Sequence, residues 1–228
     1  MSFAFQERPS DSPFVERIWH TRSEQAETFT STASARWEMV VVNYMGKITL
    51  HLRGPETVAT PMVCPADAEF FAINFKLGTF MPQLPTRNRL NQNDVILTEA
   101  SSRKFWLNGS AWQFPNFENA DTFVNRLVCD GLLVHDPVVS AALQGYPSDL
   151  SPRMMQYRFL QATGLPHRTI DQIERARRAL MLLKQGTSIL DTVYEAGYSD
   201  QAHLTRALKH YIGNTPAQVI GAVQLQAV

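Results

Sequence analysis

The sequence has few cysteines, no long apolar run and no net charge, and each absence narrows the possibilities. Its two cysteines, Cys64 and Cys129, lie far apart and form no CxxC pair. This argues against a disulfide framework or a zinc knuckle and favours a reducing compartment. No apolar run approaches the roughly 20 residues that span a bilayer, and the stretch MSFAFQERPSDSPF lacks the features of a signal peptide. We therefore expect a cytoplasmic protein with no membrane partner.

The zero net charge hides an uneven distribution along the chain. Residues 1–130 hold 12 basic and 14 acidic side chains, whereas residues 150–228 hold 9 basic and 5 acidic ones. The direction of this asymmetry suits a basic C-terminal module joined to a near-neutral partner domain. A slightly Arg-rich, solvated helical domain would have the same composition, so charge alone does not decide between them.

The N-terminal half also lacks the motifs of an enzyme. It has no HxH pair, no GxGxxG or GxxxxGK[ST] loop and no Ser/His/Asp or Cys/His arrangement, and its isolated His20 and His51 are a poor basis for a metal site. We expect no cofactor, no metal and no catalytic residue. The first 115 residues have short β-branched and aromatic runs, with a hairpin turn expected at Met45-Gly46-Lys47, which favours a barrel or sandwich.

Helical signals dominate from about residue 117. A helix is expected at roughly 117–134, and Asp136-Pro137 and Ser151-Pro152 each place a capping side chain before a proline at the first helical position. A long helix is expected from about Pro166 to Lys184. Ser188-x-x-Asp191 is an approximate capping box for the helix that follows.

An internal repeat links two of these helices. Ser151 and Asp200 are each followed by an apolar residue at +4 and +8 and by a glycine at +13, so that the two segments share an offset of 49 residues. Two copies of one supersecondary unit explain this offset better than chance does.

The second copy has the features of a helix-turn-helix. In SILDTVYEAGYSDQAHLTRALKHY, Gly197 can end the first helix in the left-handed conformation, and Ser199 or Asp200 can cap the second. With Leu204 and Leu208 buried, polar side chains lie on the outer face. Arg suits the O6/N7 edge of guanine and Gln the N6/N7 edge of adenine, whereas Thr and the helix N-terminus can contact phosphate.

These residues resemble the AraC/XylS family of transcription regulators. AGYSDQAHLTRALKHYIGNTPAQV is similar to the second helix-turn-helix of that family, SPRMMQYRFLQATGLP to its first recognition helix and QIERARRALMLL to its linker helix. The resemblance covers roughly residues 136–220 and implies two recognition helices in successive major-groove segments of promoter DNA. The DNA-contacting residues that it implies are Arg153, Gln156, Tyr157, Arg158, Gln201, Ala202, His203, Thr205 and Arg206.

Two departures from the family pattern concern the first unit. Tyr157 stands where the family usually has Arg, matching Arg206 in the repeat, and QGYPSDL makes the turn longer than the usual 3–4 residues. We therefore expect the first unit to read fewer bases than the second and to grip phosphate through Arg153 and Arg158. His203 is equally well explained as a packing residue.

For the N-terminal half the resemblance implies a cupin-like β-barrel that senses a small-molecule effector or mediates homodimerisation. Polar and aromatic residues expected on strands are candidates for an effector pocket, although about half of any such list points the other way. These candidates are Trp37, Tyr44, His51, Arg53 and Phe75.

The sequence thus predicts an α+β protein with three parts: a β-rich sensor or dimerisation domain at 1–115, a helical connector at 116–135 and an AraC-type DNA-binding domain at 136–228. The predicted function is sequence-specific regulation of transcription without enzymatic activity, with promoter DNA as partner and RNA polymerase as a candidate partner. The alternative is a β-barrel small-molecule-binding protein or cupin-type enzyme whose helical tail assists oligomerisation.

Overall fold

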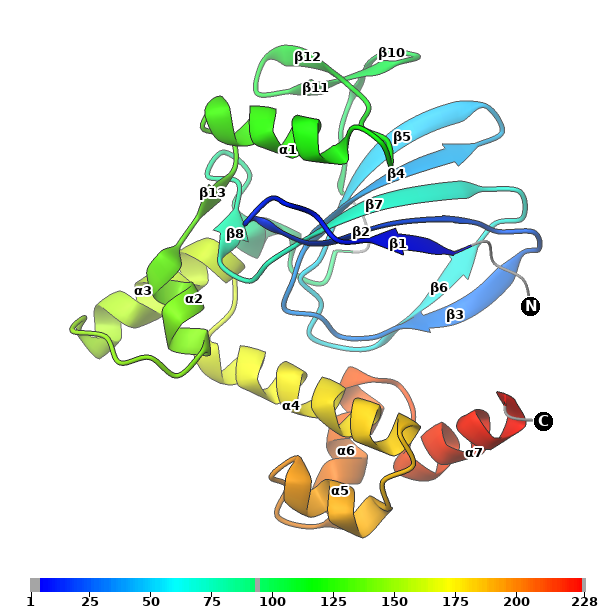
Figure 1. Ribbon diagram of the computed structural model, residues 1–228, viewed down its shortest axis with the longest axis vertical. Coiled ribbons are helices and arrows are strands. Elements are labelled where there is room, and N and C mark those ends of the chain that lie inside the picture. Colours follow the sequence, from blue (N-terminus) through cyan, green and yellow to red (C-terminus); the bar gives the residue numbers. More distant parts are fainter. Residues whose placement is uncertain (1–4, 93–94, 227–228) are drawn as a thin grey trace.

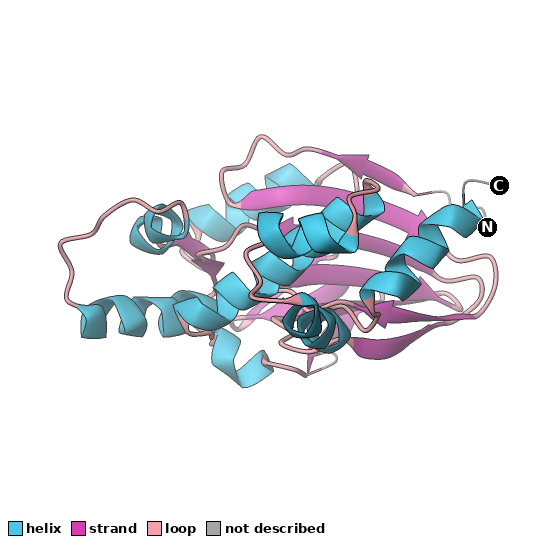
Figure 2. Cartoon of the chain, turned by 90° about the horizontal axis from the view of Figure 1, so that it is seen from below, coloured by secondary structure: helices cyan, strands magenta, loops and turns pink. Residues whose placement is uncertain are grey.

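A computed structural model describes residues 5–92 and 95–226 of the 228-residue chain, and the side chains of those up to residue 222. A β-rich N-terminal half is followed by a helical C-terminal half (Figure 1). Helices α2 and α3 lie beside one end of the β region, and α4 runs from them to the separate group α5–α7 (Figures 1 and 2). The expected α+β class is confirmed.

The largest sheet has six antiparallel strands in the order β1-β2-β7-β4-β5-β9. One face of its inner strands carries Ile18, Met39 and Ile73, which are fully buried in the main hydrophobic core. The strands are β1 (Gln6–Arg8), β2 (Val15–Arg22), β4 (Glu38–Tyr44), β5 (Lys47–Arg53), β7 (Glu69–Phe75) and β9 (Val95–Ile96).

The hairpin between β4 and β5 forms at the predicted turn. Met45 and Gly46 have φ angles of 52° and 78°, and Tyr44 pairs with Lys47 across the two-residue connection. Positive φ at both central residues is typical of the turn that matches the right-handed twist of the flanking strands. The turn sets the register that puts alternate residues of β4 into the core.

Three smaller sheets surround the large one: β10–β11–β12, the ribbon β3–β6 and the pair β8–β13. Among the residues that the structure describes, no hydrogen bonds join these sheets into a closed ring, so the predicted barrel is wrong in this respect: the domain is an open arrangement of sheets. The strands are β3 (Glu27–Ser31), β6 (Thr60–Cys64), β8 (Thr79–Phe80), β10 (Glu99–Ser101), β11 (Lys104–Leu107), β12 (Ser110–Gln113) and β13 (Val134–His135), with a short 3-10 helix, η1, at Thr86–Arg89.

The helix predicted at roughly 117–134 is shorter, α1 at Ala120–Cys129, and the chain returns to the β region as β13. Its Phe123, Val124 and Leu127 are buried in the main core with residues of the large sheet. The helix therefore completes the core of the N-terminal half rather than standing apart from it.

The remaining helices begin where the sequence places capping residues. The side chains of Asp136, Ser151, Ser188 and Asp200 each accept a hydrogen bond from a backbone amide in the first turn of the helix that follows. Such side chains satisfy amides that have no partner within the helix. The helices are α2 (Pro137–Leu143), α3 (Pro152–Thr163), α4 (His167–Lys184), α5 (Ile189–Glu195), α6 (Gln201–Tyr211) and α7 (Pro216–Gln226).

Candidate nucleic-acid interface

The second helix pair, α5 and α6, has a core built from the C-terminal half alone. Leu204 and Leu208 on α6 are fully buried against Val193 of α5 and Ala176 and Leu183 of α4. Gly197 in the turn has a φ of 74°, as the helix-turn-helix pattern requires. One side of α6 is therefore fixed, and the opposite side faces solvent.

The solvent-facing side of α6 carries most of the predicted DNA contacts. Gln201, Ala202 and Arg206 are exposed, and Thr205 is half-buried with its hydroxyl donating to the carbonyl oxygen of Gln201 at 2.8 Å. A helix-spaced group of this kind presents donors, acceptors and a methyl group to one surface, which is what readout of base edges needs.

Asp200 fixes the N-terminal end of α6. Its Oδ1 accepts the backbone amide of His203 at 2.7 Å, and this bond, with one from the Ser199 hydroxyl, holds the pKa of Asp200 below its ordinary value. The carboxylate thus satisfies the His203 amide, which has no hydrogen-bond partner within the helix. The carboxylate also interacts with the backbone amide of Ala202 and lies at the positive end of the helix dipole, where a negative charge is stabilised.

His203 packs against the turn as well as lying on α6. Its ring meets the Tyr198 ring edge-on, with centroids 5.1 Å apart, and its Nδ1 lies 3.1 Å from the Ser199 hydroxyl. Burial raises the pKa of Tyr198 to about 12, so this neighbour stays neutral. These contacts make His203 a support for the turn whether or not it also reaches DNA.

The first helix pair, α2 and α3, borrows part of its core from the N-terminal half. Phe159 of α3 is fully buried in a cluster with Ala33 and Ala35, which precede β4, and with Ile170 and Ile173 of α4. The Phe159 ring also stacks on His167, with centroids 4.5 Å apart. The first unit is therefore fixed to the β region by apolar packing.

The predicted contacts on α3 fall into two groups. Arg153, Gln156 and Tyr157 are exposed, Tyr157 with 60% of its surface accessible. Arg158 instead donates to the Oδ1 of Asp136 at 3.0 Å, the same oxygen that caps α2. The structure thus joins Arg158 to the first helix of its own unit.

Helix α4 sets the spacing of the two units. Its 18 residues correspond to a length of about 27 Å, which is comparable with the ~34 Å of one duplex turn. Arg36, which follows Ala35 in the N-terminal half, reaches Glu174 on this helix at 2.6 Å. The linker helix therefore contacts both the β region and the helical units.

Of the residues predicted to form an effector pocket, two line one cavity. His51 and Arg53 of β5 face a 430 Å³ cavity between the large sheet and the β3–β6 ribbon. Trp37 and Phe75 lie in the main core, stacked with ring centroids 4.2 Å apart, and the Trp37 indole donates to the carbonyl oxygen of Thr79. Tyr44 is exposed at the end of the β4–β5 hairpin.

Most walls of this cavity are apolar side chains that the sequence did not single out. The large sheet contributes Val40, Val42 and Phe70, and the ribbon contributes Phe29 and Met62. Strand alternation could have grouped the sheet residues on one face, but the sequence gives no signal that β3 pairs with β6. The hydroxyl oxygen of Thr21, also in this wall, is buried and has no hydrogen-bond partner within 5–92 and 95–226.

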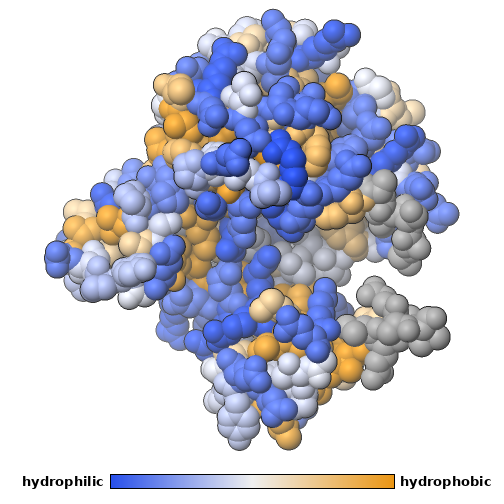
Figure 3. All heavy atoms as spheres, viewed as in Figure 1, coloured by the Kyte–Doolittle hydropathy of each residue, from blue (hydrophilic) through white to orange (hydrophobic). Residues whose placement is uncertain are grey.

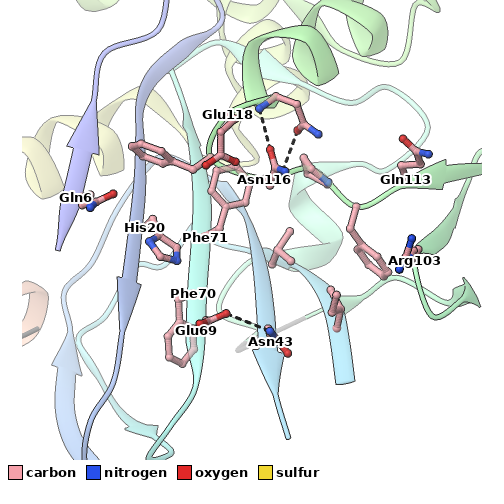
Figure 4. A pocket seen from close by; sticks show the side chains of 16 residues that line it. Gln6, His20, Asn43, Glu69, Phe70, Phe71, Arg103, Gln113, Asn116 and Glu118 are labelled. Carbon is pink, nitrogen blue, oxygen red and sulfur yellow. Dashed lines mark hydrogen bonds between the residues drawn. The ribbon is translucent and has the colours of Figure 1, made fainter. Parts of the chain in front are cut away.

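A second cavity, of 590 Å³, lies over the opposite face of the large sheet (Figure 4). Its labelled side chains include His20, Glu69 and Arg103, and Asn43 donates to Glu69 at 3.1 Å. Its wall is more polar than that of the cavity under the ribbon. Among the described residues, no group of three or more His, Cys, Asp or Glu side chains could hold a metal ion.

The visible surface of both halves is mainly hydrophilic, with apolar side chains in small groups (Figure 3). None of the described helices is both long enough and apolar enough to cross a bilayer. These surfaces are compatible with α3 and α6 being presented to a solvated, charged partner.

Comparison with known protein families identifies the C-terminal part. Residues 148–221, about a third of the chain, match a family model described as a helix-turn-helix domain. This confirms the AraC-type resemblance for that segment, which contains both α3 and α6. The class of protein that this domain defines is a DNA-binding transcription regulator, and the match favours this class over the enzyme or simple binding protein.

Comparisons with whole proteins add little to this. The sequence finds no match among curated proteins. Two solved structures of ToxT from Vibrio cholerae are similar at 12% identity: one covers 97% of this chain and 98% of its own with a TM-score of 0.37. The other, from strain O395 and bound to (E)-4-(8-methylnaphthalen-1-yl)but-3-enoic acid, covers 96% and 99% with a TM-score of 0.33. The match of residues 148–221 to the helix-turn-helix family model is what supports the class of protein.

Proposed function

We propose that the chain recognises a specific promoter sequence through α3 and α6 and that its N-terminal half controls this binding. The observation that carries the proposal is that the two helices repeat one design. Each has a capped N-terminal end, a buried side and an exposed polar side. Helix α4, which connects the two units, is about 27 Å long, comparable with the ~34 Å of one duplex turn.

The exposed side of α6 is proposed as the main base reader. Arg206 suits guanine and Gln201 suits adenine, and Ala202 can contact a thymine methyl group. We propose phosphate contacts for the start of α6 and for Thr205, whose hydroxyl would leave the Gln201 carbonyl oxygen to make one. On α3, Arg153, Gln156 and Tyr157 have the corresponding exposed positions. Arg158 acts on DNA only if its bond to Asp136 opens.

The cavity under the β3–β6 ribbon is proposed as the effector site. A volume of 430 Å³ lies within the range of ligand pockets, roughly 300–1,000 Å³. Its apolar walls and the unpartnered hydroxyl oxygen of Thr21 favour a small, mainly apolar molecule with a hydrogen-bonding group, because a buried polar atom gains most from a partner there. His51 and Arg53 lie at the same wall.

We propose two further partners, RNA polymerase and a second copy of the chain, on the basis of the proposed function. A regulator of promoters acts in the cytoplasm together with RNA polymerase, and homodimerisation through the N-terminal half would let it bind paired half-sites. Sedimentation of the protein with and without promoter DNA checks the dimer. No enzymatic reaction is assigned to the chain.

Selection of binding sites from random duplex DNA by the full-length protein tests the proposal. The full chain is needed because the core of the first unit includes Ala33 and Ala35. We expect an enriched motif with salt-dependent affinity, since phosphate contacts release counterions. The Gln201→Ala/Arg206→Ala variant should not enrich that motif. No enrichment by the folded wild-type protein would overturn the proposal.

A further inference from the structure

The C-terminal end of α6 is held by the N-terminal half. The amide of Ala33 donates to the carbonyl oxygen of Tyr211 at 2.7 Å, and the amide of Ala59 donates to that of His210 at 2.9 Å. The last carbonyls of a helix have no partner within it, so these bonds replace water or a local cap. The recognition helix is thereby tied to a surface outside its own domain.

Both donors lie at one end of the β3–β6 ribbon. Ala33 follows β3, Ala59 precedes β6, and Ser31 pairs with Thr60 where the two strands end. At the same place the methyl group of Thr30 lies 2.7 Å from where a Cβ on Gly213 would be, so only glycine fits there without a shift. Figure 1 shows the end of α6 beside this end of the ribbon.

The ribbon is also one wall of the effector cavity. Phe29 pairs with Met62 in the ribbon register, and both side chains line the cavity. Thr30 is the next residue on β3, so its side chain points to the other face of the ribbon. The β3–β6 ribbon therefore has the cavity on one face and the end of α6 on the other.

The ribbon is less firmly held than the first helical unit. Within the described residues, its two strands form hydrogen-bonded ladders only with each other, and an isolated two-stranded sheet is marginally stable. Helix α3, in contrast, is fixed to the β region through the fully buried Phe159. Displacement of the ribbon would therefore act on the C-terminal end of α6, whose His210 and Tyr211 carbonyl oxygens are bonded to it.

We infer that the β3–β6 ribbon couples the cavity to the second recognition helix, so that an occupant of the cavity changes the affinity for operator DNA. The inference rests on the proposed function, and it adds the route of regulation. Because coupling between two sites is reciprocal, operator DNA changes the affinity for the occupant by the same factor.

A covalent occupant allows the test without knowledge of the effector. Cys64 is buried at the cavity wall on β6, whereas Cys129 is exposed. In a Cys129→Ser protein, the Cys64 thiol reacts with benzyl methanethiosulfonate to form a mixed disulfide, and methanesulfinate leaves. The reaction places a benzylthio group in the cavity. Val42→Trp fills the same cavity from the sheet and needs no access by a reagent.

We expect either occupant to change the dissociation constant for the selected operator by roughly fivefold or more. Hydrogen exchange of the peptides that contain Ala33 and Ala59 should also quicken, and this readout needs no DNA. A folded protein in which both occupants leave exchange and operator affinity unchanged overturns the inference. Altered exchange without any operator selection would instead remove the proposed function and leave the mechanical link.

Two matched variants test the route. Thr30→Tyr places bulk against Gly213, whereas Thr28→Tyr places the same side chain on the same face of β3, further from α6. We expect Thr30→Tyr to shift operator affinity and to reduce the effect of the Cys64 label at least by half. Thr28→Tyr should do neither. Equal effects of the two variants would exclude the ribbon as the route.

Discussion

Gly164 and Gly213 end the two recognition helices at equivalent positions of the repeat, and both lie against the N-terminal half. A Cβ on Gly164 would be 3.0 Å from the backbone nitrogen of Arg87, and one on Gly213 would be 2.7 Å from the Thr30 methyl group. Both have positive φ angles, 74° and 86°. The glycines therefore serve as helix ends and as points of close approach between the two halves.

Alanine substitution separates these two roles. Gly197 has a φ of 74°, and no atom of the residues that the structure describes lies within 4 Å of where its Cβ would be, so Gly197→Ala should cost only the backbone strain, roughly 1–2 kcal/mol. Gly164→Ala should reduce the free energy of unfolding by more, because its neighbour is backbone. Gly213→Ala should also cost more than Gly197→Ala. Adding Thr30→Ala to Gly213→Ala should remove this difference in the free energy of unfolding, because the Thr30 methyl group is then absent. Urea unfolding measures all four, and equal costs at the three glycines would contradict the close approach.

The packing of the first unit on the β region can be measured in the same way. Phe159→Ala removes a fully buried ring from the cluster that includes Ala33 and Ala35, and we expect a loss of about 3–5 kcal/mol in the free energy of unfolding. Leu160→Ala, next in the chain and 39% exposed, is the control and should cost less than about 1 kcal/mol. A loss for Phe159→Ala no larger than that of the control would show that the cluster does not stabilise the protein.

Local features of the fold could be predicted from the sequence, whereas the contacts between its halves could not. The caps at Ser151 and Asp200 and the turn at Met45-Gly46 depend on residues close in the chain, and all three are confirmed. The pairing of β3 with β6 joins residues far apart in the chain. No local pattern determines such a pairing, because alternation defines two faces of a strand but not what covers them.

The same limit applies to the candidate sites. Helical spacing identified the exposed positions of α6 because Leu204 and Leu208 define its buried side. It could not show that Arg158 of α3 donates a hydrogen bond to Asp136, the residue that caps α2. Likewise, His51 faces the cavity under the ribbon and Phe75 the main core, although both are on inner strands of one sheet.

The cap of α6 should make stability depend on pH in a defined direction. Hydrogen bonds from the His203 amide and the Ser199 hydroxyl lower the pKa of Asp200 in the folded protein. A lowered pKa contributes stability above the unfolded-state pKa, and this contribution is lost as the pH falls through the folded-state pKa. Asp200→Asn keeps a capping oxygen without the titration.

The melting temperatures of wild type and Asp200→Asn, followed from about pH 6 downwards, check this sign. We expect the wild type to lose stability relative to Asp200→Asn below about pH 4, the ordinary range of an Asp pKa. Asp200→Ala should be less stable than both at neutral pH because it lacks the cap. A wild-type advantage that grows as the pH falls would contradict the lowered pKa.

The two recognition helices should differ in how much sequence they read. On α6 the side chains of Gln201 and Arg206 are both exposed, and each base contact of this type discriminates by about 1–3 kcal/mol. On α3 a tyrosine, Tyr157, holds the place of Arg206, and Arg158 is bonded to Asp136. We therefore expect Gln201→Ala/Arg206→Ala to lose more discrimination between operator and random DNA than Arg153→Ala/Gln156→Ala does.

Competition binding at two salt concentrations measures this difference. If Arg206 reads a base, Arg206→Ala weakens operator binding and leaves binding to random duplex nearly unchanged. If it contacts phosphate, both affinities fall together and the salt dependence becomes shallower. A larger loss of discrimination in the α3 double variant would reverse the ranking, because it would mean that the longer turn and Tyr157 do not prevent the first unit from reading bases.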